Sequence, residues 1–463
     1  MESFSKLSPE DQATAQHVRK VYAYLEEVGV PGDGFAEGIE RTREHRPLSQ
    51  HILNHQSQRR QDQRICDLAE AEIAVLRSAD RYGFFKNPTS ERSIILHSLF
   101  FYPSNATVSN RDAPPKPENP YVDVAENQIE LRRISKWNEM LMGDRRDSGS
   151  NIISYRLNDQ WTHQTDRFEK RCYKGIPDRW RRAAWDLLIK YFAIHKIPID
   201  RSERLSQSFK SDEKLIEQFT MAIQIPSDQD VQIDLDVPRT INGHIFFHTR
   251  YGRGQRALFQ VLHAFGMHCE TCGYCQGMGP IAATLLNYFD AEMAYVAMVR
   301  LHDWYDFHQI FAPGFPGLVE CFYVQERLTE YLLPNIHKVF TQQMISTSSF
   351  ATKWYITLFA NTVPFEAQLR LLDVLLLEGM DILILASVAI IFSLRFDLSQ
   401  GNDFEMILST LSSRFEMSLQ TSKAWIRSIR KLGKRKDVQD VMTKARVQWK
   451  EAVKDGSASR KVT

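Results

Sequence analysis

Two short motifs contain residues suited to the hydrolysis of a nucleotide. Arg239 lies in the motif of residues 233–240, and Gln276 lies in the motif of residues 274–278. A guanidinium can neutralise the charge that develops on a phosphoryl group, and a carboxamide can orient the attacking water. The sequence contains no G-x-x-x-x-G-K-[ST] loop, which would bind the phosphates of a nucleotide. Catalytic groups without a nucleotide site predict a protein that completes the active site of another protein.

Taken singly, each motif also has a simpler explanation. Pro238 restricts the residue before it to an extended conformation, which places Arg239 in a loop or at a helix entry. Asp236 is close enough in sequence to form an ordinary surface ion pair with Arg239, worth about 0–1 kcal/mol. Gly277 directly follows Gln276, and glycine allows the close backbone approach that suits a carboxamide at the rim of a site.

A third motif lies upstream, where residues 175–177 read Gly-Ile-Pro. Pro177 cannot continue an incoming helix, but a new helix can begin directly after it. Arg181 and Trp185 are four residues apart on that helix, so they share one face and could stack.

The same region contains three evenly spaced cysteines, Cys269, Cys272 and Cys275. Their spacing matches the first three ligands of a bacterial iron–sulfur motif, but Gly279 stands where the fourth cysteine would be. A zinc site would also need a fourth ligand, for which His263 and His268 are nearby candidates. A structural metal is therefore an alternative to reduced, metal-free thiols.

The composition narrows the class of protein. The 463 residues are 43% hydrophobic and 25% charged, and the formal net charge of +1 gives no reason to expect a nucleic-acid partner. Six cysteines and a polar amino terminus without an apolar signal segment predict reduced thiols in the cytoplasm. The longest apolar run, residues 382–394, is shorter than the roughly 18 residues that suggest a membrane span. It predicts a buried helix.

The elements that must position the motifs are predicted to be helices, and we expect an all-α fold. Helical patterns occupy residues 8–29, 62–79 and 255–268 and a short segment around Trp137 and Leu141. Pro364 and Gly379 mark the start and end of another helix, and Asp381 is a candidate N-cap for the apolar helix after it. No internal repeat is evident.

Three regions follow from these patterns. Residues 1–165 form an extension with helical segments and a proline-rich linker at about 103–120. Residues 166–400 form the core of the domain that carries the motifs, and residues 401–463 add further helices and a basic tail.

The three motifs occur in the order G-I-P-x₃-R-x₃-W, I-x-x-D-x-x-R-T and Y-x-Q-G-M. In combination they resemble the TBC-domain family, the GTPase-activating proteins of Rab GTPases, without a substitution at any defining position. Residues 353–359 and 373–379 are also similar to later family elements, so the resemblance covers roughly residues 170–400. Residues 80–84 and the Trp137 segment resemble leader elements of such proteins.

The resemblance implies a multi-helix TBC domain in which Arg239 is an arginine finger and Gln276 a glutamine finger, both supplied to a GTP-bound Rab. GTP and Mg²⁺ would belong to the Rab, and this chain would need no cofactor. An arginine finger accelerates hydrolysis on the order of 10³–10⁵-fold, or roughly 4–7 kcal/mol of transition-state stabilisation. The residues with implied supporting roles are Asp236, Thr240, Tyr274, Gly277, Arg181 and Trp185.

Two further expectations concern partners. A family member that only binds a Rab, as a non-catalytic adaptor, would use the same helical surface. The carboxy-terminal segment is basic around Trp425 and Ile429, through Arg427, Arg430, Lys431, Lys434, Arg435 and Lys436. Such a helix could contact an anionic membrane, which suits a cytoplasmic protein that acts peripherally on endomembranes or the plasma membrane in vesicle trafficking. A solvated helix face is the alternative.

Overall fold

The computed structural model describes residues 7–30, 79–85, 93–96, 124–146, 150, 152–198, 201, 209–400 and 403–456. The chain forms two compact units, each built from two separate stretches. The first unit comprises Met1–Ser90 and Ser211–Met298, and the second comprises Glu91–Lys210 and Val299–Thr463. Helices dominate both units, so the predicted all-α fold is confirmed. The regional boundary expected near residue 165 stays a prediction.

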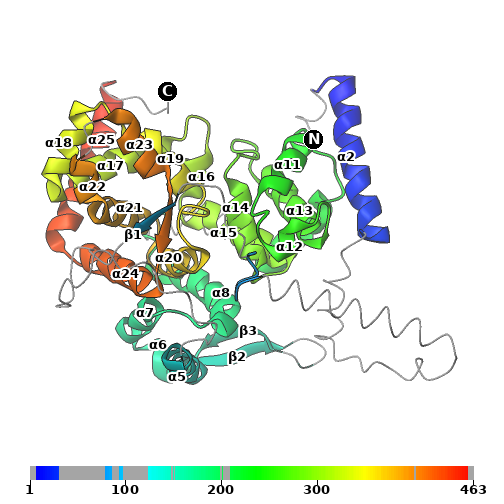
Figure 1. Ribbon diagram of the computed structural model, residues 1–463. Coiled ribbons are helices and arrows are strands. Elements are labelled where there is room, and N and C mark those ends of the chain that lie inside the picture. The colour runs from blue at the N-terminus through cyan, green and yellow to red at the C-terminus, as the bar shows by residue number, and fades with distance from the viewer. Residues whose placement is uncertain are drawn as a thin grey trace, which may run out of the picture. The chain divides into compact units, whose positions relative to one another are not determined.

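The first unit is arranged around one central helix (Figure 1). Its helices are α2 (Pro9–Val28), α10 (Asp212–Ala222), α11 (Asp230–Asp236), η2 (Val237–Arg239), α12 (Ile245–His248), α13 (Arg253–His268), α14 (Met278–Leu286) and the start of α15 (Ala291–Trp304). Helix α13 packs against α2, α10, α11, α12 and α14. Its apolar residues Leu258, Leu262 and Phe265 are buried, as the helical stripe over residues 255–268 predicts.

The amino-terminal extension is part of this unit. Helix α2 begins after Ser8, whose side chain accepts a hydrogen bond from the backbone N–H of Asp11, and the helix predicted over residues 8–29 is confirmed. The ring of Tyr22 stacks on Phe259 of α13 with a centroid distance of 3.8 Å. Residues 79–85 add a short extended segment, in which Phe84 pairs with His244. Residues 62–78 of the second predicted helix lie outside the described residues.

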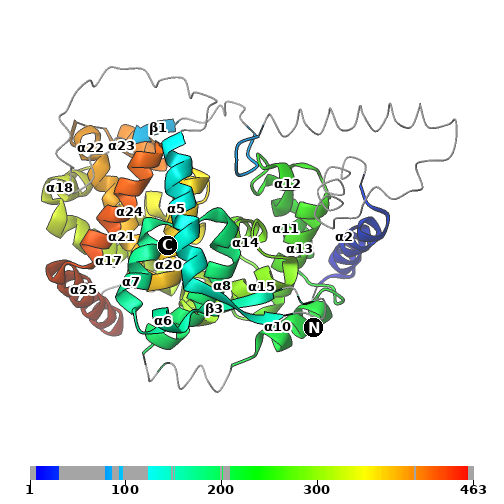
Figure 2. The same cartoon turned by 90° about the horizontal axis from the view of Figure 1, so that it is seen from below.

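The second unit contains the remaining elements. Its helices are α5 (Val124–Met140), α6 (Asp159–Thr162), α7 (Thr165–Lys174), α8 (Asp178–His195), α16 (Phe307–Phe311), α17 (Pro316–Leu332), α18 (Pro334–Gln342), α19 (Thr347–Ile356), α20 (Phe365–Glu378), α21 (Asp381–Ser393), α22 (Arg395–Gln400), α23 (Phe404–Ser412), α24 (Leu419–Gly433) and α25 (Lys436–Lys454). Its strands are β1 (Ser93–Leu96), β2 (Leu141–Arg146), β3 (Ile152–Leu157) and β4 (Arg414–Met417). The pairs β1–β4, which is parallel, and β2–β3, which is antiparallel, were not predicted. Figure 2 shows α5 and α8 beside the β2–β3 hairpin, and α5 contacts β2 while α8 contacts β3.

Helices α20 and α21 form much of the buried interior of this unit. Helix α20 follows Pro364 and ends at Gly379, where φ is 94°, as the proline and glycine predicted. The apolar run of residues 382–394 lies in and just after α21, and residues 382–391 and Leu394 are buried. The prediction that Asp381 caps α21 is wrong, because Met380 is the N-cap and Asp381 is the first helical residue. The Asp381 carboxylate forms an ion pair with Arg446.

No helix within the described ranges combines the length and the apolar character needed to cross a membrane. The proline-rich linker predicted at about residues 103–120 lies outside the part of the chain that the structure describes.

Candidate functional site

Arg239 is presented at the end of a buried helical segment in the first unit. Helix α11 continues directly into the 3₁₀ turn η2, of which Arg239 is the last residue. Ile233 and Val237 are fully buried, so the apolar side of this segment is fixed in the unit. The prediction that Pro238 holds Val237 extended is wrong: Val237 is helical, with φ of −52° and ψ of −50°. Pro238 lies in the first turn of η2, where its missing N–H removes no helical hydrogen bond. The Arg239 side chain is 58% exposed, so a buried segment carries a solvent-facing guanidinium.

Gln276 lies in a short loop, residues Gly273 to Gly277, which we call the glutamine loop. Both bounding glycines are in the left-handed region, with φ of 56° at Gly273 and 115° at Gly277. Gly277 is also the N-cap of α14, and Met278, the first residue of that helix, is buried. Gln276 itself is exposed. The loop therefore presents a carboxamide beside the start of a buried helix.

A single carboxylate connects Arg239 with Tyr274 of the glutamine loop. Asp236 Oδ1 accepts hydrogen bonds from the Arg239 guanidinium and, at 3.1 Å, from Gln232 Nε2. Asp236 Oδ2 accepts a hydrogen bond from the Tyr274 hydroxyl at 2.8 Å. The Asp236 side chain is only 4% exposed. Burial raises the pKa of Tyr274, and the hydrogen bond and charge of Asp236 raise it further, so the hydroxyl remains a donor at neutral pH.

Thr240 extends this connection to α14. Its hydroxyl donates a hydrogen bond to the backbone carbonyl of Asp236 at 2.9 Å. A Cβ placed on Gly279 of α14 would lie 2.9 Å from Thr240 Oγ1, so the absence of a side chain at Gly279 allows the helix to approach this closely. The arginine motif and the helix after the glutamine loop thus pack directly on each other.

Other polar groups around α11 were not predicted from the sequence. Asp234 accepts a hydrogen bond from the Tyr22 hydroxyl of α2 at 2.8 Å and pairs with Arg250 Nη2 at 2.9 Å. Gln229, just before α11, accepts a hydrogen bond on Oε1 from the Tyr274 backbone N–H at 2.6 Å. Neither Gln229 nor Asp234 occupies a defining position of a motif, and their partners are distant in sequence, so no signal in a single sequence identifies them.

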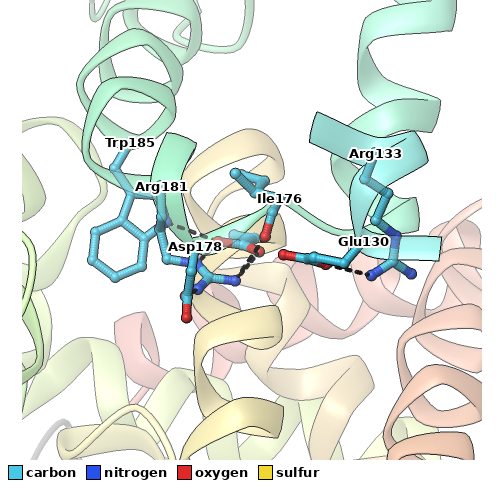
Figure 3. Close-up of polar contacts among 7 residues, drawn as sticks. Glu130, Arg133, Ile176, Asp178, Arg181 and Trp185 are labelled. Carbon is cyan, nitrogen blue, oxygen red and sulfur yellow. Dashed lines mark hydrogen bonds and ion pairs between the residues drawn. The ribbon is translucent and has the colours of Figure 1, made fainter. Parts of the chain in front are cut away.

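Arg181 and Trp185 belong to the second unit, where both project from α8 (Figure 3). The Asp373 carboxylate of α20 accepts hydrogen bonds from Trp185 Nε1 at 2.8 Å and from Arg181 Nε at 3.2 Å. Arg181 also donates to the Ile176 carbonyl at 3.0 Å and pairs with Asp178. Asp373 is fully buried and Arg181 is 3% exposed. This cluster joins two helices of the interior, and no group in it faces solvent as Arg239 does.

The cysteine motif overlaps the glutamine loop, because Cys275 lies in the loop and the other two cysteines precede it. Cys269, Cys272 and Cys275 are all partly exposed. Burial raises the pKa of Cys272 to about 12, with further contributions from Cys269 and Cys275. His263 is one candidate for a fourth metal ligand. Its Nδ1 is hydrogen-bonded to the Asp230 carboxylate and its Nε2 to the Ala222 carbonyl. Both ring nitrogens are therefore engaged with protein oxygens. Elemental analysis of the purified protein tests the metal alternative.

The basic segment near the carboxy terminus has its apolar side buried. Trp425 and Ile429 of α24 are fully buried, so they are not available for insertion into a bilayer. Arg430 lies over the ring of Tyr173 at 5.0 Å, and Arg435 pairs with Asp437. The exposed members of the segment are Arg427, Lys431, Lys434 and Lys436.

Comparison with known proteins gives a consistent family match. Residues 178–399 match the family model of the Rab-GTPase-TBC domain. A TBC domain-containing protein of Schizosaccharomyces pombe is 36% identical, over 61% of this chain and 63% of its own length. A Caenorhabditis elegans protein described as a Rab GTPase-activating protein is 28% identical, over 54% of this chain and 25% of its own length. The chain thus spans less than two thirds of each relative. The crystal structure of a Chlamydomonas flagellar RabGAP TBC domain has a TM-score of 0.48 and 17% identity, covering 66% of this chain and 95% of that one.

Proposed function

We propose, from the premise that this chain is a member of the TBC-domain family, that it accelerates GTP hydrolysis by a Rab-family GTPase. The observation that carries this proposal is the buried Asp236 carboxylate, which binds both the Arg239 guanidinium and the Tyr274 hydroxyl of the glutamine loop. This contact joins the segment that carries Arg239 to the loop that carries Gln276, which supports a joint role of the two residues in phosphoryl transfer. The GTPase would supply GTP and Mg²⁺, and this chain would contribute no cofactor.

Arg239 would act as the arginine finger. Its guanidinium is more than half exposed, so it can enter the nucleotide site of a docked GTPase and neutralise charge on the transferred phosphoryl group. The ion pair with Asp236 limits its orientations before docking. A charge that is already oriented, in an interface from which water is excluded, stabilises a transition state more than a freely moving one does.

Gln276 would act as the glutamine finger and orient the attacking water. A carboxamide suits this role because its oxygen accepts a hydrogen bond from the water and its NH₂ group donates to a neighbouring oxygen. The left-handed glycines at both ends of the loop let the backbone turn sharply, so that the side chain can face a partner. Acting together, the two fingers would regulate a Rab in vesicle trafficking.

The test is phosphate release from a panel of GTP-loaded Rab GTPases. We expect the wild-type protein to accelerate at least one Rab, and Arg239→Ala and Gln276→Ala each to lose most of the acceleration. Lys214→Ala and Gln224→Ala are matched controls, because they remove an exposed cation and an exposed carboxamide from the same unit. Equal acceleration by wild type and both finger variants would rule out the proposed fingers.

The same assay separates catalysis from the adaptor alternative. An adaptor would bind a GTP-loaded Rab, measured by calorimetry or interferometry, without changing its hydrolysis rate in any pairing. Retention of both finger residues favours catalysis, since an adaptor has no use for an exposed guanidinium oriented by a buried carboxylate.

We further propose that the exposed cations of the carboxy-terminal segment attract anionic membranes without insertion. Each Lys or Arg near an anionic surface contributes about 1 kcal/mol. Removing Arg427, Lys431 and Lys434 together should abolish sedimentation with phosphatidylserine vesicles. Replacing the exposed lysines Lys20, Lys214 and Lys338 by alanine is the matched control. Binding that does not depend on anionic lipid would exclude this contact and leave a solvated helix face.

A further inference from the structure

The carboxamide of Gln229 lies between α11 and the glutamine loop. Gln229 is the N-cap residue of α11, yet its side chain makes no capping hydrogen bond to that helix. Its Oε1 accepts the hydrogen bond from the Tyr274 backbone N–H at 2.6 Å, and its own backbone N–H donates to Ser227 Oγ at 3.2 Å. The side chain is thus committed to the loop and not to its own helix.

Two glycines leave the space that this carboxamide occupies. A Cβ on Gly273 of the loop would lie 2.3 Å from Gln229 Nε2. A Cβ on Gly266 of α13 would lie 2.7 Å from Gln229 Oε1. Both distances are shorter than real Cβ contacts, so any larger residue at either position would displace the carboxamide. The contact between Gln229 and the loop is therefore closely packed on two sides.

Helix α11 consequently binds Tyr274 at two points. Gln229, directly before the helix, binds the Tyr274 backbone N–H, and Asp236, its last residue, binds the Tyr274 hydroxyl. The two contacts come from the two ends of α11 and use the two ends of Tyr274, its backbone amide and its hydroxyl. Two separated contacts determine the orientation of Tyr274 relative to α11, and Arg239 follows the end of that same helix.

We propose that Gln229 is a positioning residue that sets the glutamine loop, and with it Gln276, relative to Arg239. This proposal rests on the proposed function. Without the Gln229 acceptor, the Tyr274 N–H loses its partner and the loop can turn about Gly273, whose φ of 56° is set in the left-handed region. A displacement on the order of 1 Å between reacting groups can cost about 100-fold in rate.

The test compares two substitutions at one position. Gln229→Leu keeps a similar volume but removes the acceptor, whereas Gln229→Glu keeps an oxygen that accepts from the Tyr274 N–H. We expect Gln229→Leu to lower kcat on a responsive Rab by about 10- to 100-fold, with KM within about twofold of wild type, and Gln229→Glu to restore much of the rate. Gln224→Leu, at an exposed glutamine of the same unit, should match wild type.

A double-mutant cycle identifies the group through which Gln229 acts. If Gln229 positions Gln276, then Gln229→Leu should cost little further rate in a Gln276→Ala background. In an Arg239→Ala background it should cost nearly as much as in wild type. An equal further loss in both backgrounds would indicate a general structural effect and would overturn the proposal.

Hydrogen exchange of the protein alone separates this proposal from the proposed function. In Gln229→Leu the Tyr274 amide should exchange at least tenfold faster than in wild type, while the amides of α13 should not change. Unchanged exchange at Tyr274, or faster exchange with wild-type kcat, would overturn the positioning role. If wild type accelerates no Rab, the proposed function fails, whereas faster exchange at Tyr274 in Gln229→Leu would still show that Gln229 sets the glutamine loop.

Discussion

The hydroxyl of Tyr274 donates a hydrogen bond to the Asp236 carboxylate at 2.8 Å, and the second oxygen of that carboxylate binds Arg239. Tyr274 and Asp236 belong to different motifs, 38 residues apart. One carboxylate therefore joins the segment that ends at Arg239 to the loop that contains Gln276.

Replacement of Tyr274 by phenylalanine should uncouple the glutamine loop from Asp236 and Arg239. The ring is retained, but Asp236 Oδ2 loses its donor, which costs about 1–3 kcal/mol of unfolding free energy. We expect kcat of stimulated GTP hydrolysis to fall by roughly tenfold, corresponding to about 1.4 kcal/mol. Single-turnover phosphate release and urea unfolding measure the two effects. Tyr24→Phe, at an exposed tyrosine of α2, is the control. Wild-type rate and stability in Tyr274→Phe would show that the hydrogen bond is dispensable.

Leu235 should contribute to binding of the GTPase. Its side chain is 60% exposed on α11, one turn before Arg239, where a docked GTPase would cover it. Burying a leucine contributes about 1.5–3 kcal/mol when complete. We therefore expect Leu235→Ser to raise KM by about tenfold and to leave kcat nearly unchanged, because the contact is the same in ground and transition states. Met221→Ser, at a 65% exposed residue of α10, should change neither constant. A fall in kcat at constant KM would contradict this role.

Asp373 should be essential for the stability of the second unit. Its replacement by alanine leaves Arg181 buried without this carboxylate and the Trp185 N–H without its acceptor. Loss of one partner from a buried ion pair costs about 3–5 kcal/mol. Urea unfolding followed by tryptophan fluorescence measures the change. Glu139→Ala breaks an exposed pair with Lys136 and should cost about 1 kcal/mol or less. A similarly small loss for Asp373→Ala would show that the cluster is not needed for stability.

The thiol of Cys272 should ionise only at high pH. Its pKa of about 12, raised by burial and then by the neighbouring cysteines, lies above the range of ordinary alkylation experiments. Because the thiolate is the reactive form, the alkylation rate by iodoacetamide should rise about tenfold per pH unit between about pH 7.5 and 9.5. A free thiol with a pKa of about 8.5 levels off over the same range. Peptide mass spectrometry identifies the site, and a plateau for Cys272 near pH 9 would disprove the raised pKa.

Much of the helical framework was predictable because its signals are local. Helix α13 agrees with the apolar stripe over residues 255–268, and α20 agrees with the bounds predicted at Pro364 and Gly379. Both signals depend only on neighbours within a few residues. Asp381 was misassigned as a cap because an acidic residue suits both the N-cap and the first helical turn. The strands β1 and β4 were missed because each is four residues long and pairs with a segment more than 300 residues away.

For the candidate site, too, the sequence predicted the local features and not the long-range contacts. The types, spacing and order of the motif residues identified Arg239, Gln276, Asp236 and Tyr274, since a motif is a local pattern of side chains. The contacts of Gln229 with Tyr274 and of Tyr22 with Asp234 join residues 45 and 212 positions apart. Which side chain meets which carboxylate or amide across such separations depends on how α2, α11 and α13 pack, and that packing exists only in the folded chain.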